Sequence, residues 1–140
     1  MIRVTRRYRF SASHRLHSAE LSEEDNRQLY GKCNNPYGHG HDYLLEVAVK
    51  GPLDTSTGRV LNPATLDGLV ALYVLKDLDH SNLNEDLPDF AALVPTSENL
   101  TIAIEQRLER VWKSAFPGEW PKLHAIRLRE TKRNGFERLA

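Results

Sequence analysis

Two segments of the chain alternate between apolar and polar residues, as strands with one buried face do. In residues 2–14 the alternation groups Ile2, Val4, Tyr8, Phe10, Ala12 and His14, with Arg6 as the one polar break. In residues 39–49 it groups His39, His41, Tyr43, Leu45, Val47 and Val49. A two-residue period predicts a half-buried strand in each segment. If these strands pair, the three histidines lie on the inner side of one sheet.

Two later segments repeat their apolar residues every three to four positions, which predicts helices. The first follows the capping pair Asn62–Pro63, runs to about Lys76, and has the apolar stripe Leu66, Leu69, Val70 and Tyr73. The second begins after Thr96 as N-cap and ends before Pro117, and its stripe is Leu100, Ala103, Ile104, Leu108 and Val111.

Alternation returns after Pro121 and completes the predicted fold. One face here carries His124, Ile126, Leu128 and Glu130, and Asn134–Gly135 is typical of a hairpin turn into a last strand. The order strand, strand, helix, helix, strand, strand favours an α+β fold with helices on one face of an antiparallel sheet. Residues 17–33 and 78–95 show no regular pattern and are expected to be long functional loops.

Length and charge narrow the class of protein. The 140 residues fit one domain, residues 1–140, and 19 basic residues balance 19 acidic ones. A balanced charge gives no field that would recruit nucleic acid or an anionic membrane, so neither partner is expected. With no apolar leader, no membrane span and a single cysteine, the chain is expected to be cytoplasmic and free of internal disulfides.

The histidines His14, His39 and His41 suggest a metal site. Three neutral imidazoles without a fourth protein ligand are typical of a zinc site with an open position for chemistry. The alternative is that they are hydrogen-bonded strand residues without a metal. A structural zinc site would add a fourth ligand, for which Cys33 is the candidate.

Other chemistry-bearing residues lie around this cluster. Cys33, in a turn-forming sequence, could be a general base or nucleophile, a fourth zinc ligand, or an inert thiol. Asp79 and His80 could orient such a thiol, or be polar turn residues. Glu130 extends an apolar face, so it needs a partner: either a guanine-like ring edge or a neighbouring basic residue (Arg127, Arg129 or Lys132).

Five motifs in order resemble those of the 6-pyruvoyl-tetrahydropterin synthase family. They are Phe10-Ser-Ala-Ser-His14-Arg, Cys33-Asn-Asn-Pro-Tyr-Gly-His39-Gly-His41, Leu78-Asp79-His80, Pro95-Thr-Ser-Glu98-Asn and Arg129-Glu130-Thr131. The resemblance implies the tunnelling fold, a four-stranded antiparallel sheet with two helices on one face. It also implies trimeric barrels that stack in pairs into a homohexamer.

The resemblance assigns a role to each matching residue. His14, His39 and His41 would bind one Zn²⁺ per subunit, and Cys33 would be the general base. Asp79 and His80 would relay protons. Glu130 would anchor the pterin ring, and the residues near the same ring would be Thr96, Ser97 and Glu98.

The implied substrate is 7,8-dihydroneopterin triphosphate, which loses triphosphate to give 6-pyruvoyl-tetrahydropterin. Candidates for binding the triphosphate are Arg15, Lys32, Lys132 and Arg133, and Mg²⁺ could accompany it. A related branch forms 6-carboxy-tetrahydropterin for queuosine biosynthesis, and there a shorter spacer separates the cysteine from the histidine pair. The five residues between Cys33 and His39 favour the pyruvoyl product, although Tyr37 and Asp42 replace asparagines common in the animal enzymes. A pterin-binding module without catalysis is a further alternative.

Overall fold

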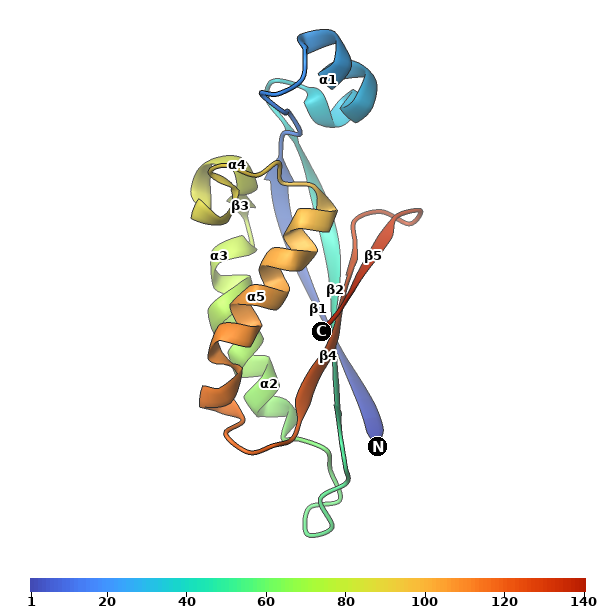
Figure 1. Ribbon diagram of the computed structural model, residues 1–140, viewed down its shortest axis with the longest axis vertical. Helices are drawn as coiled ribbons and strands as arrows, with labels where there is room; N and C mark the ends of the chain where they lie inside the picture. The colour runs from blue at the N-terminus through green and yellow to red at the C-terminus, as the bar shows by residue number, and fades with distance from the viewer.

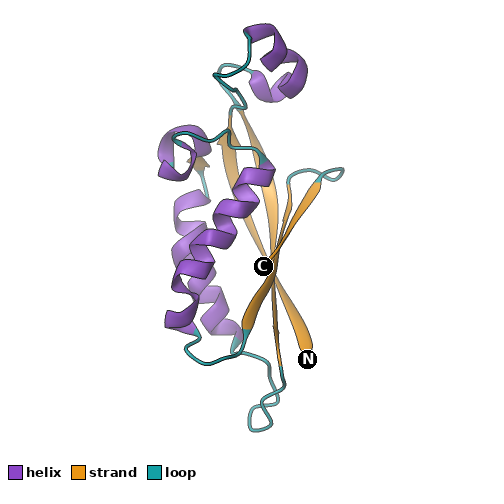
Figure 2. Ribbon diagram, viewed as in Figure 1, coloured by secondary structure: helices purple, strands orange, loops and turns teal.

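A β-sheet with helices on one face organises the computed structural model, which describes residues 1–140 (Figures 1 and 2). The predicted antiparallel strands are confirmed as β1 (Ile2–His14), β2 (His39–Gly51), β4 (Lys122–Arg129) and β5 (Gly135–Leu139). A fifth, two-residue strand, β3 (Ser81–Asn82), pairs parallel with the edge of β1 and gives the order β3-β1-β2-β4-β5. The sheet thus has one strand more than the sequence predicted.

Pairing of β1 with β2 confirms the shared face of the three histidines. The register places His14 opposite His39, Ala12 opposite His41 and Phe10 opposite Tyr43. Residues directly opposite one another in an antiparallel pair project from the same face, so the alternation of both strands coincides.

Arg6, the polar break in the alternation of β1, has a partner on the helical layer. Its guanidinium donates hydrogen bonds of 2.8 and 2.7 Å to the two carboxylate oxygens of Asp67, which also accepts one of 2.7 Å from the Tyr8 hydroxyl. The inward charge is therefore balanced, and it ties β1 to α2 (Pro63–Val70).

The first predicted helix is confirmed, but it contains an irregular turn. After α2 the chain forms a π-helical turn (Ala71–Leu75) and then α3 (Lys76–Leu78). The buried residues Leu66, Val70, Val74 and Leu78 are spaced by four. A regular α-helix has about 3.6 residues per turn, so the wider turn keeps this row on the sheet. Tyr73, expected in the buried stripe, is 39% exposed because Val74 takes that place.

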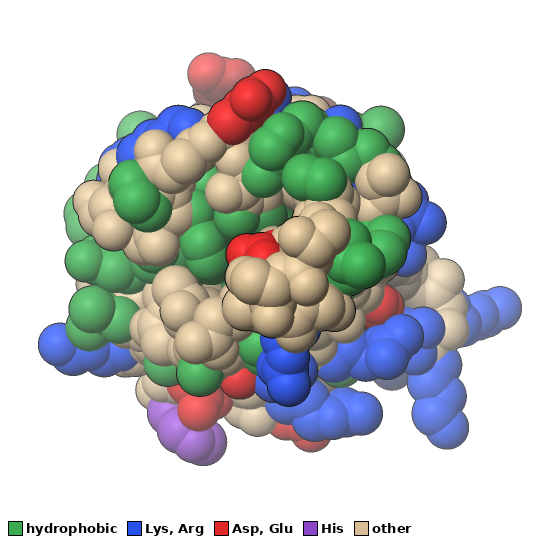
Figure 3. Space-filling view, turned by 90° about the horizontal axis from the view of Figure 1, so that it is seen from below, with side chains coloured by type: hydrophobic (Ala, Val, Ile, Leu, Met, Phe, Trp, Pro, Cys, Tyr) green, Lys and Arg blue, Asp and Glu red, His purple; other side chains and the backbone are tan.

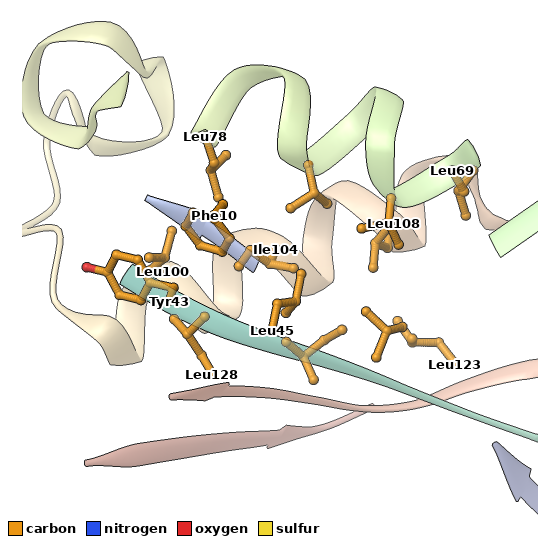
Figure 4. Packing of buried hydrophobic residues seen from close by; sticks show 14 of the residues in the cluster. Phe10, Tyr43, Leu45, Leu69, Leu78, Leu100, Ile104, Leu108, Leu123 and Leu128 are labelled. Atoms are coloured by element: carbon orange, nitrogen blue, oxygen red, sulfur yellow. The ribbon is translucent and has the colours of Figure 1, made fainter. Parts of the chain in front are cut away.

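The second predicted helix, α5 (Ser97–Ala115), is confirmed with its cap. The Thr96 hydroxyl accepts a 3.2 Å hydrogen bond from the Asn99 amide. Between this helix and the sheet lies the main core, in which Leu100, Ile104 and Leu108 pack against β-sheet residues (Figure 4). Trp112, expected in a core or an interface, is buried and donates its indole N–H to the Pro121 carbonyl.

The two stretches predicted as irregular loops contain short helices. Residues 17–33 include α1 (Glu23–Tyr30) and the start of a 3₁₀ turn (Gly31–Asn34), and residues 78–95 include α4 (Leu83–Asp86) and a 3₁₀ turn (Pro88–Phe90). The only residue that α1 buries is Asn26, whose amide donates to the carbonyls of Ser18, Leu21 and Ser22. A helix held by polar contacts has no apolar stripe that a periodicity argument could detect.

Two local predictions about the last strands were wrong. Leu123 pairs with Val49 and Ala125 with Ala48, so His124 is the extra residue of a β-bulge and does not share the buried face. The turn into β5 comprises residues 130–134, because Gly135 already pairs with Arg129. A bulge moves the side chains on one side of it to the opposite face, which strict alternation cannot anticipate.

The two faces of the sheet differ in character. Helices cover one face, and exposed arginines of β1 (Arg3, Arg7 and Arg9) lie on the other. Seen from the end that holds the N-terminus, Lys and Arg side chains gather on one side of the molecule (Figure 3). None of the helices has the length and apolarity needed to cross a membrane.

An ion-pair network joins α5 to the segment before β3. The Arg107 guanidinium donates to both carboxylate oxygens of Asp89, to Asp77 and to the Tyr73 carbonyl in the π-helical turn. Hydrogen bonding to Arg107 holds the pKa of Asp89 below its usual range. The deprotonated carboxylate therefore stabilises the fold above the unfolded-state pKa, and that stability is lost as the pH falls toward and through the lower folded-state value.

We expect Asp89→Ala to lower the free energy of unfolding by about 1.5–3 kcal/mol at pH 7, because Arg107 loses two charge-assisted hydrogen bonds. Urea denaturation across pH 3–7 would measure this. The difference from wild type should shrink below about pH 4, where the carboxyl is protonated in both states. Glu119→Ala, at an exposed position without an ion pair, is the control. Equal losses in the two variants would contradict the stabilising role of Asp89.

Candidate metal centre and active site

The three histidines meet at the end of the β1–β2 pair. Their ring centroids lie 4.5–5.4 Å apart, and His14 is 1% exposed. Potential ligand atoms of His14, Cys33, His39 and His41 all lie within 4.8 Å of one another. This confirms the predicted clustering and gives a donor set of nitrogen and sulfur, which is the set that zinc prefers.

The hydrogen bonds of the imidazoles leave nitrogen lone pairs available for a cation. Nδ1 of His14 lies 2.9 Å from the Pro95 carbonyl, so this nitrogen carries the proton and Nε2 is left with a lone pair. Nε2 of His14 and Nε2 of His41 are buried without a hydrogen-bond partner. Burial lowers the pKa of both His14 and His41, which favours the neutral form that binds metals. Unpartnered nitrogens facing one another fit a bound metal ion better than they fit an empty polar cluster.

Gly38 allows the loop before β2 to approach the end of β1. Its φ is +69°, and a Cβ at this position would lie 2.7 Å from the His14 carbonyl oxygen. A larger residue would therefore push His39 away from His14. Tyr37, the preceding residue, is 96% exposed and contributes no packing within the chain.

Cys33 reaches the cluster from the 3₁₀ turn after α1. The Leu16 amide donates a 2.7 Å hydrogen bond to the Cys33 carbonyl, which fixes this turn beside the end of β1. The Cys33 Sγ lies 3.0 Å from Nε2 of His39. Burial, and secondarily the charge of Glu130, raises the pKa of the thiol, whereas a bound cation would lower it. At this distance the sulfur can serve as a fourth ligand or as a base beside the metal.

Glu130 lies on the other side of the imidazoles. Its side chain is 13% exposed, and Oε1 is 3.0 Å from Nε2 of His41. Its other oxygen accepts a hydrogen bond from the hydroxyl of Ser97, the first residue of α5. None of the neighbouring basic residues takes the role of its partner, and Arg127 instead pairs with Glu137.

Of the other residues predicted near the ring, only Ser97 contacts Glu130. Thr96 acts as the cap of α5. Glu98 is exposed and lines a hollow between α5 and β5 with Phe136 and Arg138. The structure therefore groups Ser97 and Glu130 with the imidazoles and leaves Glu98 apart.

Asp79 and His80 lie at the edge of the sheet, where β3 meets β1. Asp79 accepts a 2.9 Å hydrogen bond from the Ser11 amide, and the His80 amide donates to the Ser11 carbonyl. The His80 side chain is 83% exposed, lies 3.6 Å from Asp79, and has a left-handed backbone with φ 59°. No hydrogen bond or ion pair connects either residue to Cys33, Glu130 or the imidazole cluster within one chain.

Tyr43 is a site residue that the sequence argument missed. It is fully buried, and its hydroxyl has no hydrogen-bond partner although Ser97 and Glu130 lie near it. Burial raises its pKa, so the hydroxyl keeps its proton and remains a donor. Alternation treated Tyr43 as an apolar residue. The signal that could have identified it is a hydroxyl-bearing ring next to two histidines on the same face.

The chain is similar to known proteins over nearly all of its length. The family model of 6-pyruvoyl tetrahydropterin synthase matches residues 3–139. The 6-pyruvoyl tetrahydrobiopterin synthase of Poecilia reticulata is 45% identical over 94% of this chain and 85% of its own, and that of Homo sapiens is 49% identical over 77% and 74%. The solved structure of the Caenorhabditis elegans 6-pyruvoyl tetrahydropterin synthase superposes with a TM-score of 0.90, covering 99% of this chain and 95% of its own at 37% identity.

We expect the purified chain to bind one zinc ion and to melt at a higher temperature when zinc is bound, because a ligand of the folded state stabilises it. His14→Ala should abolish stoichiometric zinc and the zinc-dependent rise in melting temperature. Elemental analysis and thermal denaturation with and without a chelator would measure both. His124→Ala, at the bulge, should retain both properties. Full zinc content in His14→Ala would contradict the assignment of this residue as a ligand.

Proposed function

The chain belongs to the 6-pyruvoyl tetrahydropterin synthase family, and we propose that residues 1–140 form a zinc-dependent lyase of this type. It would convert 7,8-dihydroneopterin triphosphate to 6-pyruvoyl-tetrahydropterin with elimination of triphosphate. The observation that carries the proposal is the convergence of three imidazoles, a thiol and a carboxylate at one end of the sheet.

The imidazoles of His14, His39 and His41 would hold zinc. When bound, zinc would polarise the side-chain hydroxyls of the substrate and so acidify the neighbouring C–H bonds. The hydrogen bond from His14 to the Pro95 carbonyl would orient the ring for this role.

Cys33 would be the general base. Its Sγ lies beside the imidazoles, 3.0 Å from His39 Nε2, where the charge of a bound cation would favour the thiolate. The protons would pass on through Asp79 and His80. This pair does not contact Cys33 of its own chain, so the relay would have to act on the site of a neighbouring subunit.

Glu130 would anchor the pterin ring by accepting hydrogen bonds from the N–H and NH₂ groups of its pyrimidine edge. The hydrogen bond from Ser97 to one oxygen of Glu130 supports a fixed orientation of this carboxylate. Zinc bound at His41 Nε2 would compete with the contact between this nitrogen and Glu130, which would free the second oxygen for the ring.

We propose further that the chain assembles into a hexamer of two trimeric barrels. The sheet ends in the edges β3-β1 and β5, and edges that remain open tend to pair with other chains. The exposed His80, with its left-handed backbone, lies beside one of these edges. Such an assembly would place the relay pair of one subunit next to the site of another.

Native mass spectrometry is expected to give six times the 16.0 kDa mass of the chain. Inserting a proline at Val4 of the β1 edge should reduce this mass, because proline interrupts strand pairing. A monomer that is fully active would contradict a shared active site.

The runner-up is a 6-carboxy-tetrahydropterin synthase, which would act on the same substrate. The five residues between Cys33 and His39 favour the pyruvoyl product. A pterin-binding module without catalysis ranks lower, because Cys33, the three histidines and the Asp79–His80 pair are all retained.

We expect zinc-loaded protein to release triphosphate from 7,8-dihydroneopterin triphosphate, and Cys33→Ala to lower kcat by at least about 100-fold with its zinc content unchanged. Mass spectrometry of the product and elemental analysis of both proteins would test this. Acetaldehyde with 6-carboxy-tetrahydropterin would support the runner-up instead. Loss of zinc in Cys33→Ala would make the thiol a ligand, and binding of substrate without turnover by wild type would support the binding module.

A further inference from the structure

The hydroxyl of Tyr43 is an unpaired donor in an otherwise hydrogen-bonded site. The residue is 0% exposed, and its oxygen has neither a protein partner nor contact with solvent. The half-buried Tyr8 on β1, by contrast, donates a 2.7 Å hydrogen bond to Asp67. A buried hydroxyl without a partner is costly, so its retention calls for a state in which it is paired.

The ring of Tyr43 is fixed, so its hydroxyl cannot swing to a distant partner. The ring stacks on Phe10 with centroids 4.9 Å apart and an interplanar angle of 17°. Figure 4 shows the ring among the core residues, with the hydroxyl pointing away from Leu45 and toward the outer end of the cluster. The partner must therefore be a group at the site itself, beside Ser97 and Glu130.

Ser97 can accept the missing hydrogen bond. Its hydroxyl donates its only proton to Glu130, and a hydroxyl oxygen keeps lone pairs for acceptance. The nearby Thr101 hydroxyl does not compete, because it donates to the Ser97 carbonyl at 2.6 Å. A hydrogen bond from Tyr43 to Ser97 would complete a chain of three groups that ends on the Glu130 carboxylate.

We propose that Tyr43 is a positioning residue for pterin recognition: its hydroxyl donates to Ser97 when Glu130 binds the ring, and so keeps the Ser97 hydroxyl directed at Glu130. The inference rests on the proposed function, in which Glu130 anchors the pyrimidine edge. Hydrogen bonds in such a chain polarise and strengthen one another. Tyr43 thus acts only in the ligand-bound state.

This mechanism predicts opposite effects on stability and on binding. Tyr43→Phe removes a hydroxyl that is unpaired in the free protein, so the melting temperature without ligand should stay equal or rise. The same change should weaken binding of 7,8-dihydroneopterin by about 5- to 15-fold, the equivalent of one hydrogen bond. In turnover of the triphosphate substrate, KM should rise by a similar factor while kcat stays within about twofold.

The test measures binding of 7,8-dihydroneopterin to the zinc-loaded full chain by fluorescence titration, with melting temperature and zinc content measured in parallel. Tyr8→Phe is the matched control, since it removes a paired hydroxyl far from Glu130. It should lower the melting temperature and leave binding unchanged. In a Ser97→Ala background, Tyr43→Phe should have no further effect on binding, because the hydroxyl acts through Ser97.

Three outcomes would overturn the inference. Equal affinity of Tyr43→Phe and wild type would remove the role in binding. A melting temperature lowered as much as in Tyr8→Phe would mean that the hydroxyl is already paired in the free protein and is merely structural. Additive losses in the double variant would mean that it does not act through Ser97. Failure of wild type to bind the pterin would instead refute the proposed function, and the role of Tyr43 with it.

Discussion

The register between β1 and β2 is the constraint on which the site depends. Pairing runs without interruption from Ile2–Gly51 to His14–His39 and puts every second residue of both strands under the helices. A slip by one residue would move the histidines, Phe10 and Tyr43 of one strand to the opposite face. The same pairing therefore specifies both the hydrophobic core and the cluster of imidazoles at its end.

The site occupies the boundary between this core and the polar end of the sheet. Tyr43 and Phe10 form the last apolar layer, and the imidazoles follow directly. Buried histidines remain neutral there because burial disfavours their charged form. The packing that excludes water thus also prepares the nitrogens as ligands, and the carboxylate of Glu130 completes the polar layer above them.

Sequence patterns predicted the parts of the structure that depend on periodic burial. The histidine face of β1 and β2, both long helices and the Thr96 cap followed from alternation, helical spacing and capping chemistry. The bulge at His124, the π-helical turn and the polar helix α1 could not be predicted, because each interrupts or lacks an apolar period. The pairing of Ser97 with Glu130 joins residues far apart in sequence and needed the three-dimensional structure.

The lobe of residues 15–38 has a consequence for how the protein loses activity. It projects beyond the sheet (Figure 1) and is held by side-chain amides such as that of Asn26, with little apolar burial. Segments of this kind open locally at a lower free energy than the core requires to unfold. Cys33 resides in this lobe, whereas the histidines belong to the strands. Amide hydrogen exchange would thus register the displacement of the thiol well before any global transition, in molecules that still retain their metal ligands.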